Sequence, residues 1–118
     1  MAQTIDQAKT GGFENVAVIG FGLIGASFAA ALRAANPSAQ VMAVDTDLAT
    51  RVEAVNRGSA TATAAPDAAE FRAFIGDGCD LVVLATPVSV VEGYLKDLAE
   101  WGYRGIITDT ASTKSRII

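Results

Sequence analysis

The sequence predicts an α/β domain in which a doubly wound parallel sheet lies between two layers of helices. Short runs rich in β-branched residues alternate along the chain with segments whose apolar residues recur at helical spacing. The predicted strands are residues 15–20, 40–45, 59–65, 80–85 and 106–108. Strands that alternate with helices usually form a parallel sheet with right-handed crossovers. These observations indicate a three-layer, Rossmann-like fold that is incomplete at its C-terminus.

Apolar residues at helical spacing predict the first two helices. In the first helix they are Ile24, Phe28, Ala31, Leu32 and Ala35, and on one face of the second they are Leu48, Val52 and Val55. Asn36-Pro37 is expected to end the first helix, because proline interrupts helical hydrogen bonding. Asp47 is expected to cap the second helix and Gly58 to end it.

The segment that follows is less regular. Residues 59–65 alternate weakly between apolar and polar, which fits a short edge strand. Asp67, with Glu70 three residues later, predicts the start of a brief third helix. The runs 80–85 and 106–108 belong to strands that we expect helices to cover on both faces, because their residues are mostly apolar.

A fourth helix is predicted between these two strands. Thr86 is expected to be its cap and Pro87 its first residue, and Gly102 is expected to end it. The residues expected to face inward are Val91, Leu95 and Leu98. Trp101 follows this helix at the end far from the carboxyl edge of the sheet, so we expect it to serve in packing.

Composition and charge are typical of one small globular domain and exclude several classes of function. Of the 118 residues 51% are hydrophobic and 19% are charged, a balance typical of globular proteins. The net charge of −4 provides no broad basic surface, so binding to nucleic acid or to an anionic membrane is not expected. No apolar segment reaches the roughly 20 residues that cross a bilayer.

The cysteine count and the N-terminal segment bear on the cellular compartment. Cys79 is the only cysteine, so no disulfide can form within the chain, and we expect its side chain to be buried. Residues 1–12 lack the apolar segment of a secretory signal and are expected to be a flexible tail before a domain that spans residues 13–118. The sequence therefore predicts a cytoplasmic protein.

A glycine-rich turn joins the first predicted strand to the first helix. Its sequence GFGLIG matches the GxGxxG pattern over Gly20, Phe21, Gly22, Leu23, Ile24 and Gly25. Gly20 would permit a tight turn, Gly22 would let the backbone approach a pyrophosphate, and Gly25 would let helix and strand pack closely. The phosphates would face the N–H groups of the helix N-terminus, so an acidic protein needs no basic patch. The alternative is an ordinary strand-to-helix turn without a ligand.

Two further segments are expected to line the same groove. Asp45 ends the second strand about 25 residues after Gly20, beside Thr46. A carboxylate at this place can accept hydrogen bonds from an adenosine ribose and would repel a 2′-phosphate, which favours NAD over NADP. The alternative is a strand-end aspartate that only faces solvent.

The second segment follows the fourth predicted strand. Ala85, Thr86 and Pro87 leave that strand at the edge of the sheet where the glycine turn also lies, so they are expected to line the cofactor groove. Thr86 as a helix cap is compatible with this position. No residues in a metal-binding pattern accompany the groove.

Three motifs taken in order narrow the family. GLIGAS at residues 22–27, LATPV at 84–88 and TDTASTK at 108–114 together resemble the prephenate dehydrogenase family. The resemblance spans nearly the whole chain after Gly12, and TDTASTK is its most specific part, since glycine turns occur in many dehydrogenases. It implies an NAD or NADP cofactor that takes hydride from prephenate or arogenate while carbon dioxide leaves, in the biosynthesis of tyrosine.

The resemblance also assigns an active-site serine. It places this residue at Ser112, where the side chain would hydrogen-bond the substrate hydroxyl, although Ser112 could also cap a helix. Lys114 could pair with Asp109 or lie near a substrate carboxylate, and a solvated lysine is the simpler interpretation.

The sequence departs from the family in two ways. The family has a catalytic histidine just beyond the serine, but this chain has no histidine. The family also has a later helical domain, which supplies a substrate-binding arginine and the dimer interface, and we expect this domain to be absent from the chain. We therefore expect this chain to bind cofactor without turnover, as part of a longer homodimeric enzyme. Two alternatives are another NAD-dependent dehydrogenase of the β-hydroxyacid or imine type, and a stand-alone dinucleotide-sensing module.

Overall fold

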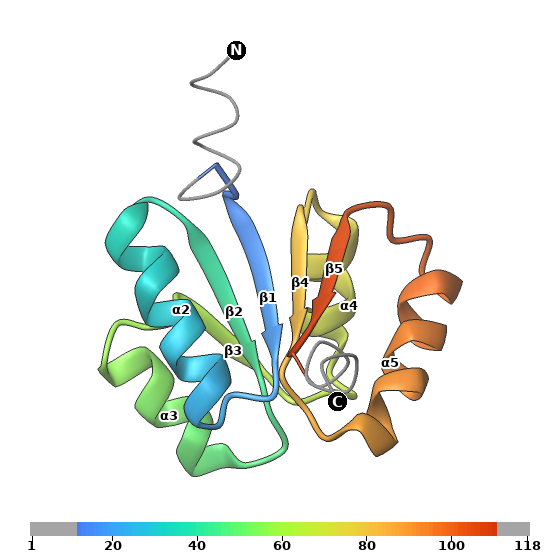
Figure 1. Ribbon diagram of the computed structural model, residues 1–118, viewed down its shortest axis with the longest axis horizontal. Helices are drawn as coiled ribbons and strands as arrows, with labels where there is room; N and C mark the ends of the chain where they lie inside the picture. Colours follow the sequence, from blue (N-terminus) through green and yellow to red (C-terminus); the bar gives the residue numbers. More distant parts are fainter. Residues whose placement is uncertain (1–11, 111–118) are drawn as a thin grey trace.

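The computed structural model describes residues 12–110, and in that part nine elements alternate between strand and helix (Figure 1). They are β1 (Asn15–Ile19), α2 (Leu23–Ala35), β2 (Gln40–Val44), α3 (Leu48–Asn56), β3 (Ala62–Ala64), α4 (Ala69–Gly76), β4 (Leu81–Leu84), α5 (Val88–Glu100) and β5 (Ile106–Asp109). The five predicted strands and four predicted helices are confirmed. The expected tail lies almost entirely outside the described residues.

All five strands form one parallel sheet in the order β3-β2-β1-β4-β5. Ile19 at the end of β1 lies beside Val44 of β2 and Leu84 of β4, so the carboxyl ends of these strands lie together. In Figure 1 all strand arrows point to this same edge. The strand order reverses between β1 and β4, which is where ligands bind in open α/β sheets. The Rossmann-like fold is confirmed.

Helices cover both faces of the sheet, with α2 and α3 on one side and α4 and α5 on the other (Figure 1). Alternate residues of β1 point to opposite faces: Val16 and Val18 pack with α2, while Ala17 and Ile19 pack with α4 and α5. Burial of the central strands on both faces explains their continuous apolar sequences.

Two predicted helix caps are wrong. The N-cap of α4 is Ala68, because a hydrogen bond from its N–H to the carbonyl of Ala65 (3.0 Å) keeps Asp67 inside the preceding turn. The N-cap of α5 is Pro87 rather than Thr86, because the ψ angle of Pro87 is 148° and the helix begins only at Val88. The predicted cap at Asp47 is confirmed: its carboxylate accepts the N–H of Thr50 at 3.0 Å.

The predicted apolar faces of the helices are partly wrong. Leu48, Val52 and Val55 are exposed, because α3 buries Ala54 instead. A small side chain at this position lets the helix approach the sheet closely. In α2 the buried residues are Gly25, Ala29 and Leu32, whereas Ile24, Ala31 and Ala35 are exposed. In α5 Val91 and Leu98 are buried as predicted, but Leu95 is exposed.

The two strands expected to be covered on both faces differ. All four residues of β4 are buried, as predicted. In β5, however, Ile106 and Ile107 are 55% and 37% exposed, because β5 lies at the edge of the described sheet. Cys79 is buried, as predicted. Among the helices within residues 12–110, none has the length and apolar character needed to cross a membrane.

Candidate functional site

The glycine turn between β1 and α2 contains two glycines that the packing requires. Gly20 has a φ of +88°, and a Cβ at this position would lie 2.7 Å from both the carbonyl oxygen of Ala85 and Cγ2 of Thr86. A Cβ at Gly25 would collide with the carbonyl oxygen of Gly20. Both glycines therefore have the structural tasks that the sequence predicts, a tight turn and close packing of helix against strand.

Gly22 has a different environment from these two glycines. It has a φ of −74°, and a Cβ at this position would meet no atom within 4 Å. Gly22 is also the N-cap residue of α2, where no side chain caps the helix and no acidic residue lies in the first turn. The first N–H groups of a helix have no partner within it, and the dipole favours an anion there. The open space beside Gly22 therefore suits the approach of a phosphate group.

Asp45 lies beside this turn and is held by two backbone amides. Its Oδ2 accepts a hydrogen bond from the N–H of Phe21 at 2.8 Å, and its Oδ1 accepts one from the N–H of Asp47 at 2.9 Å. These bonds fix the carboxylate against the glycine turn. Each carboxylate oxygen has a further lone pair, so Asp45 can still accept hydrogen bonds from a hydroxyl group.

A hollow of about 370 Å³, called here the central hollow, opens at the carboxyl edge of the sheet. It is lined by Gly20, Gly22, Val44, Asp45, Thr46, Ala85, Thr86, Pro87, Val90 and Tyr94. The structure thus brings together seven residues predicted for the site, from the turns that follow β1, β2 and β4. Sequence reasoning missed Val44, Val90 and Tyr94. The spacing of Val90 and Tyr94 places them on one face of α5, but the sequence does not show that this face lies beside Asp45.

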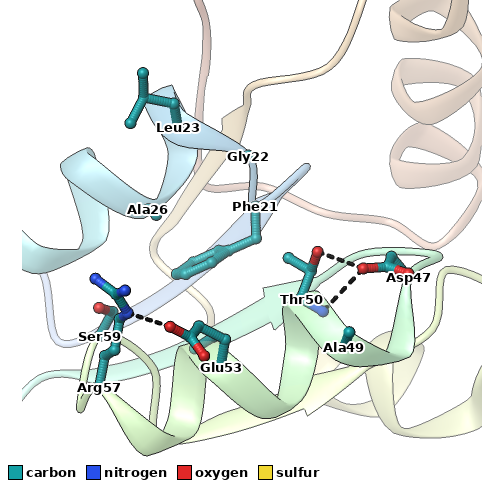
Figure 2. Close-up of a pocket in the computed structure, with 11 residues that line it drawn as sticks. Phe21, Gly22, Leu23, Ala26, Asp47, Ala49, Thr50, Glu53, Arg57 and Ser59 are labelled. Atoms are coloured by element: carbon teal, nitrogen blue, oxygen red, sulfur yellow. Dashed lines mark hydrogen bonds and ion pairs between the residues drawn. The ribbon is translucent and has the colours of Figure 1, made fainter.

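A second hollow of about 350 Å³, called the α2–α3 hollow, lies on the other side of the glycine turn (Figure 2). Phe21 and Leu23, predicted for the cofactor site, line this hollow and not the central one. Figure 2 shows the Phe21 ring directed toward α3 and Leu23 directed away from it. Gly22 lines both hollows.

Four of the residues considered in the sequence remain to be placed individually. Ile24 is 51% exposed and lines neither hollow. Thr86 is half-buried, and its Oγ1 is buried without a hydrogen-bond partner within residues 12–110. Ser112 and Lys114 lie outside the described residues. Nearby, Asp109 ends β5 and the hydroxyl of Thr110 donates to the carbonyl of Leu84 at 3.3 Å.

Tyr94 is a residue of α5 whose ionisation is affected by Asp45, a residue of the central hollow. Its side chain is half-buried, and its pKa is raised by burial and then by the negative charges of Asp45 and Asp97. The hydroxyl group therefore stays protonated at neutral pH and can donate a hydrogen bond. Within residues 12–110 no group of three or more His, Cys, Asp or Glu side chains is placed to hold a metal ion.

Comparison with known proteins extends these findings. Residues 28–118 match the family model of the prephenate dehydrogenase nucleotide-binding domain. The prephenate dehydrogenase of Lactococcus lactis subsp. cremoris (strain MG1363) is 30% identical over 109 residues, which cover 89% of this chain and 28% of the relative. A crystal structure of prephenate dehydrogenase from A. aeolicus, in complex with hydroxyphenyl propionate and NAD⁺, has a TM-score of 0.64 and 24% identity. The match covers 81% of this chain and 32% of that one.

Proposed function

Because the chain belongs to the family of prephenate dehydrogenase nucleotide-binding domains, we propose that its central hollow binds NAD. The observation that carries this proposal is the open space beside Gly22, next to a fixed carboxylate at Asp45. A phosphate can approach the backbone there without meeting a side chain. The A. aeolicus enzyme of the same fold was crystallised with NAD⁺, which supports the choice of cofactor.

The residues present define how the dinucleotide would be held. The pyrophosphate would lie over Gly22 at the N-terminus of α2, and the adenosine ribose would donate hydrogen bonds to Asp45. The charge of Asp45 would repel the 2′-phosphate of NADP, so NAD is the preferred form. Thr46, Ala85, Thr86 and Pro87 would form the walls.

The activity of the whole protein is a further part of the proposal. The chain spans 28% of the Lactococcus relative and 32% of the A. aeolicus chain. We propose that the longer protein carries out oxidative decarboxylation of prephenate or arogenate, as a cytoplasmic homodimer. Bound NAD supplies the hydride acceptor. Ser112 would hydrogen-bond the substrate hydroxyl, and the proton acceptor would come from outside this chain, which has no histidine.

Calorimetric titration of the chain with NAD and NADP tests the cofactor assignment, with Gly22→Val as the diagnostic variant. Wild type should bind NAD more tightly than NADP. Gly22→Val should reduce NAD affinity at least tenfold, because the new side chain occupies the space needed by the pyrophosphate. Its free energy of unfolding should fall by no more than about 1 kcal/mol, because the added Cβ meets no atom within 4 Å and the remaining cost is that of an apolar residue at a helix N-cap.

The outcomes of this titration separate the possibilities. If Gly22→Val binds NAD with the same affinity as wild type, the assigned position of the pyrophosphate is wrong. Absence of binding to either dinucleotide by the folded wild-type chain would contradict the cofactor assignment as a whole. If the longer protein forms no NADH with either prephenate or arogenate as substrate, the proposed reaction is wrong.

A further inference from the structure

The α2–α3 hollow lies outside the proposed cofactor site, although Gly22 lines both. Its volume of about 350 Å³ is within the range of small-molecule binding sites. Apolar side chains from the glycine turn, α2 and α3 line its middle, among them Phe21, Ala26 and Ala49. The hollow therefore has the size and the apolar lining that a small ligand requires.

The side chains of α3 leave this hollow open. The helix contributes Ala49 and Ala54 to the lining, whereas its larger apolar residues Leu48, Val52 and Val55 are exposed outside the hollow. Burial of a large apolar side chain is favourable, so packing alone would place one of these residues in the space between α2 and α3. The alanines leave that space for a ligand instead.

One end of the hollow carries both signs of charge. Glu53 and Arg57 form an ion pair there between Oε2 and Nε, and Ser59 lies beside them (Figure 2). Within residues 12–110, Oε1 of Glu53 and the two terminal nitrogens of Arg57 make no hydrogen bond. Glu53 can therefore accept from an ammonium group, and Arg57 can donate to a carboxylate. An α-amino acid with an apolar side chain combines these two groups with an apolar body.

The hollow also shares two residues with the turn that holds Asp45. The side chain of Phe21 lines the hollow, and the N–H of Phe21 donates to Asp45. Asp47 lines the opposite end, where its carboxylate accepts hydrogen bonds from the N–H and hydroxyl of Thr50 (Figure 2). The N–H of Asp47 donates to Asp45 as well. A ligand that packs against Phe21 and Asp47 would therefore stabilise the turn that positions Asp45.

We propose that the α2–α3 hollow binds a free α-amino acid with an apolar side chain, and that the bound amino acid strengthens NAD binding. The apolar side chain lies against Phe21, Ala26 and Ala49, with the carboxylate at Arg57 and the ammonium group at Glu53. The amino-acid site does not depend on the proposed function, whereas its effect on NAD rests on it. Because such coupling is reciprocal, NAD strengthens amino-acid binding by the same factor.

Calorimetric titration of the chain with L-leucine and L-methionine tests the chemistry of the site. Isocaproate lacks the ammonium group of leucine and isoamylamine lacks its carboxylate, so they are matched probes. Leucine should bind roughly tenfold more tightly than either, because each analogue loses one charge-assisted hydrogen bond. Arg57→Gln should remove the preference for leucine over isoamylamine, and Glu53→Gln should remove the preference for leucine over isocaproate.

Ala49→Leu tests the location of the site, with Ala34→Leu as a matched control. Both alanines are exposed residues of a helix, and Ala49 lines the hollow whereas Ala34 does not. Ala49→Leu should weaken leucine binding roughly tenfold, because its side chain fills the space for the apolar part of the ligand. Ala34→Leu should bind leucine as wild type does.

A titration with NAD at saturating leucine tests the coupling. Leucine should raise the NAD affinity of wild type roughly fivefold. In Ala49→Leu the same concentration of leucine should change NAD affinity much less, because the hollow is filled.

The outcomes separate this inference from the proposed function. The amino-acid site is wrong if the folded wild type binds neither leucine nor methionine, if the two analogues bind as tightly as leucine, or if the two leucine variants behave alike. If leucine binds but leaves NAD affinity unchanged, the coupling is wrong. If leucine binds in the hollow and no dinucleotide binds at all, the proposed cofactor function fails while the amino-acid site stands.

Discussion

At the carboxyl edge of the sheet Asp45 accepts hydrogen bonds from the Phe21 and Asp47 amides, and at the amino edge Asp80 accepts them from Glu14 and Asn15. The two aspartates thus have similar local bonding. Within residues 12–110, a helix N-terminus with an open glycine lies beside the aspartate at the carboxyl edge and not beside the one at the amino edge. Backbone hydrogen bonds alone therefore do not distinguish a ligand-binding carboxylate from one that joins two strands.

The glycines at the two edges differ in the same way. Gly20 at the carboxyl edge and Gly78 at the amino edge have φ angles of +88° and +85°. Gly20 is also enclosed by Ala85 and Thr86, whereas a Cβ at Gly78 would meet nothing within 4 Å. The turn at Gly20 is thus more tightly packed than the turn at Gly78, even though the open space at Gly22 lies only two residues away.

The largest expected effect comes from Gly20→Ala compared with Gly78→Ala. Gly78→Ala should lower the free energy of unfolding by about 1 to 2 kcal/mol, from the left-handed backbone alone. Gly20→Ala should lower it by about 2 to 5 kcal/mol, because steric overlap with Ala85 and Thr86 adds to the backbone cost. Urea unfolding of both variants measures the difference. Equal losses would show that the turn relaxes and that its packing is not tight.

An intermediate effect is expected from Asp45→Ala compared with Asp80→Ala. Each variant removes the acceptor of two backbone amides and should lower the free energy of unfolding by about 1 to 3 kcal/mol. Only Asp45→Ala should also weaken NAD binding, by about 1 to 3 kcal/mol. Urea unfolding and calorimetric titration give the two quantities. Weaker NAD binding of similar size in Asp80→Ala would mean that both losses arise through the fold.

The smallest expected effect is a loss of stability at alkaline pH, which arises from Tyr103 at the amino edge of the sheet. Burial, with Cys79 and Asp80 as further causes, raises the pKa of Tyr103, whose hydroxyl donates to the carbonyl of Ile106 at 3.0 Å. Because an unfolded tyrosine titrates near 10, the contribution of the neutral phenol to stability is complete below about pH 10 and is lost as the pH rises further. Urea unfolding between pH 8 and 11 should show this decline. Tyr103→Phe should make it shallower, and an identical decline would exclude Tyr103 as its source.

The buried centre of the domain could be predicted from the sequence because short local patterns, the apolar strands and the glycine turn, determine it. β1 and β4 need apolar residues on both faces, and the glycine turn needs Gly20 and Gly25 for steric reasons that hold in any strand-turn-helix unit of this kind. Asp47 was also predictable as a cap, because its role depends only on residues within one helical turn.

The outer parts could not be predicted in the same way. Helical spacing identified an apolar face at Leu48, Val52 and Val55, but α3 approaches the sheet through Ala54, and the choice of face depends on the packing distance. Exposure of β5 depends on its place in the sheet rather than on its own residues. Tyr94 belongs to the candidate site because the fold places α5 beside Asp45, which the sequence alone does not show.

The bond between Asp45 and the Phe21 amide has a consequence for how cofactor preference can change during evolution. A substitution that made room for a 2′-phosphate by removing this carboxylate would also leave the amides of Phe21 and Asp47 without their acceptor. Selectivity and the folding of the turn are thus linked through one side chain. A lineage that switched dinucleotides would need a compensating substitution to support the turn, so single-site redesign at Asp45 should yield a less stable protein before it yields a selective one.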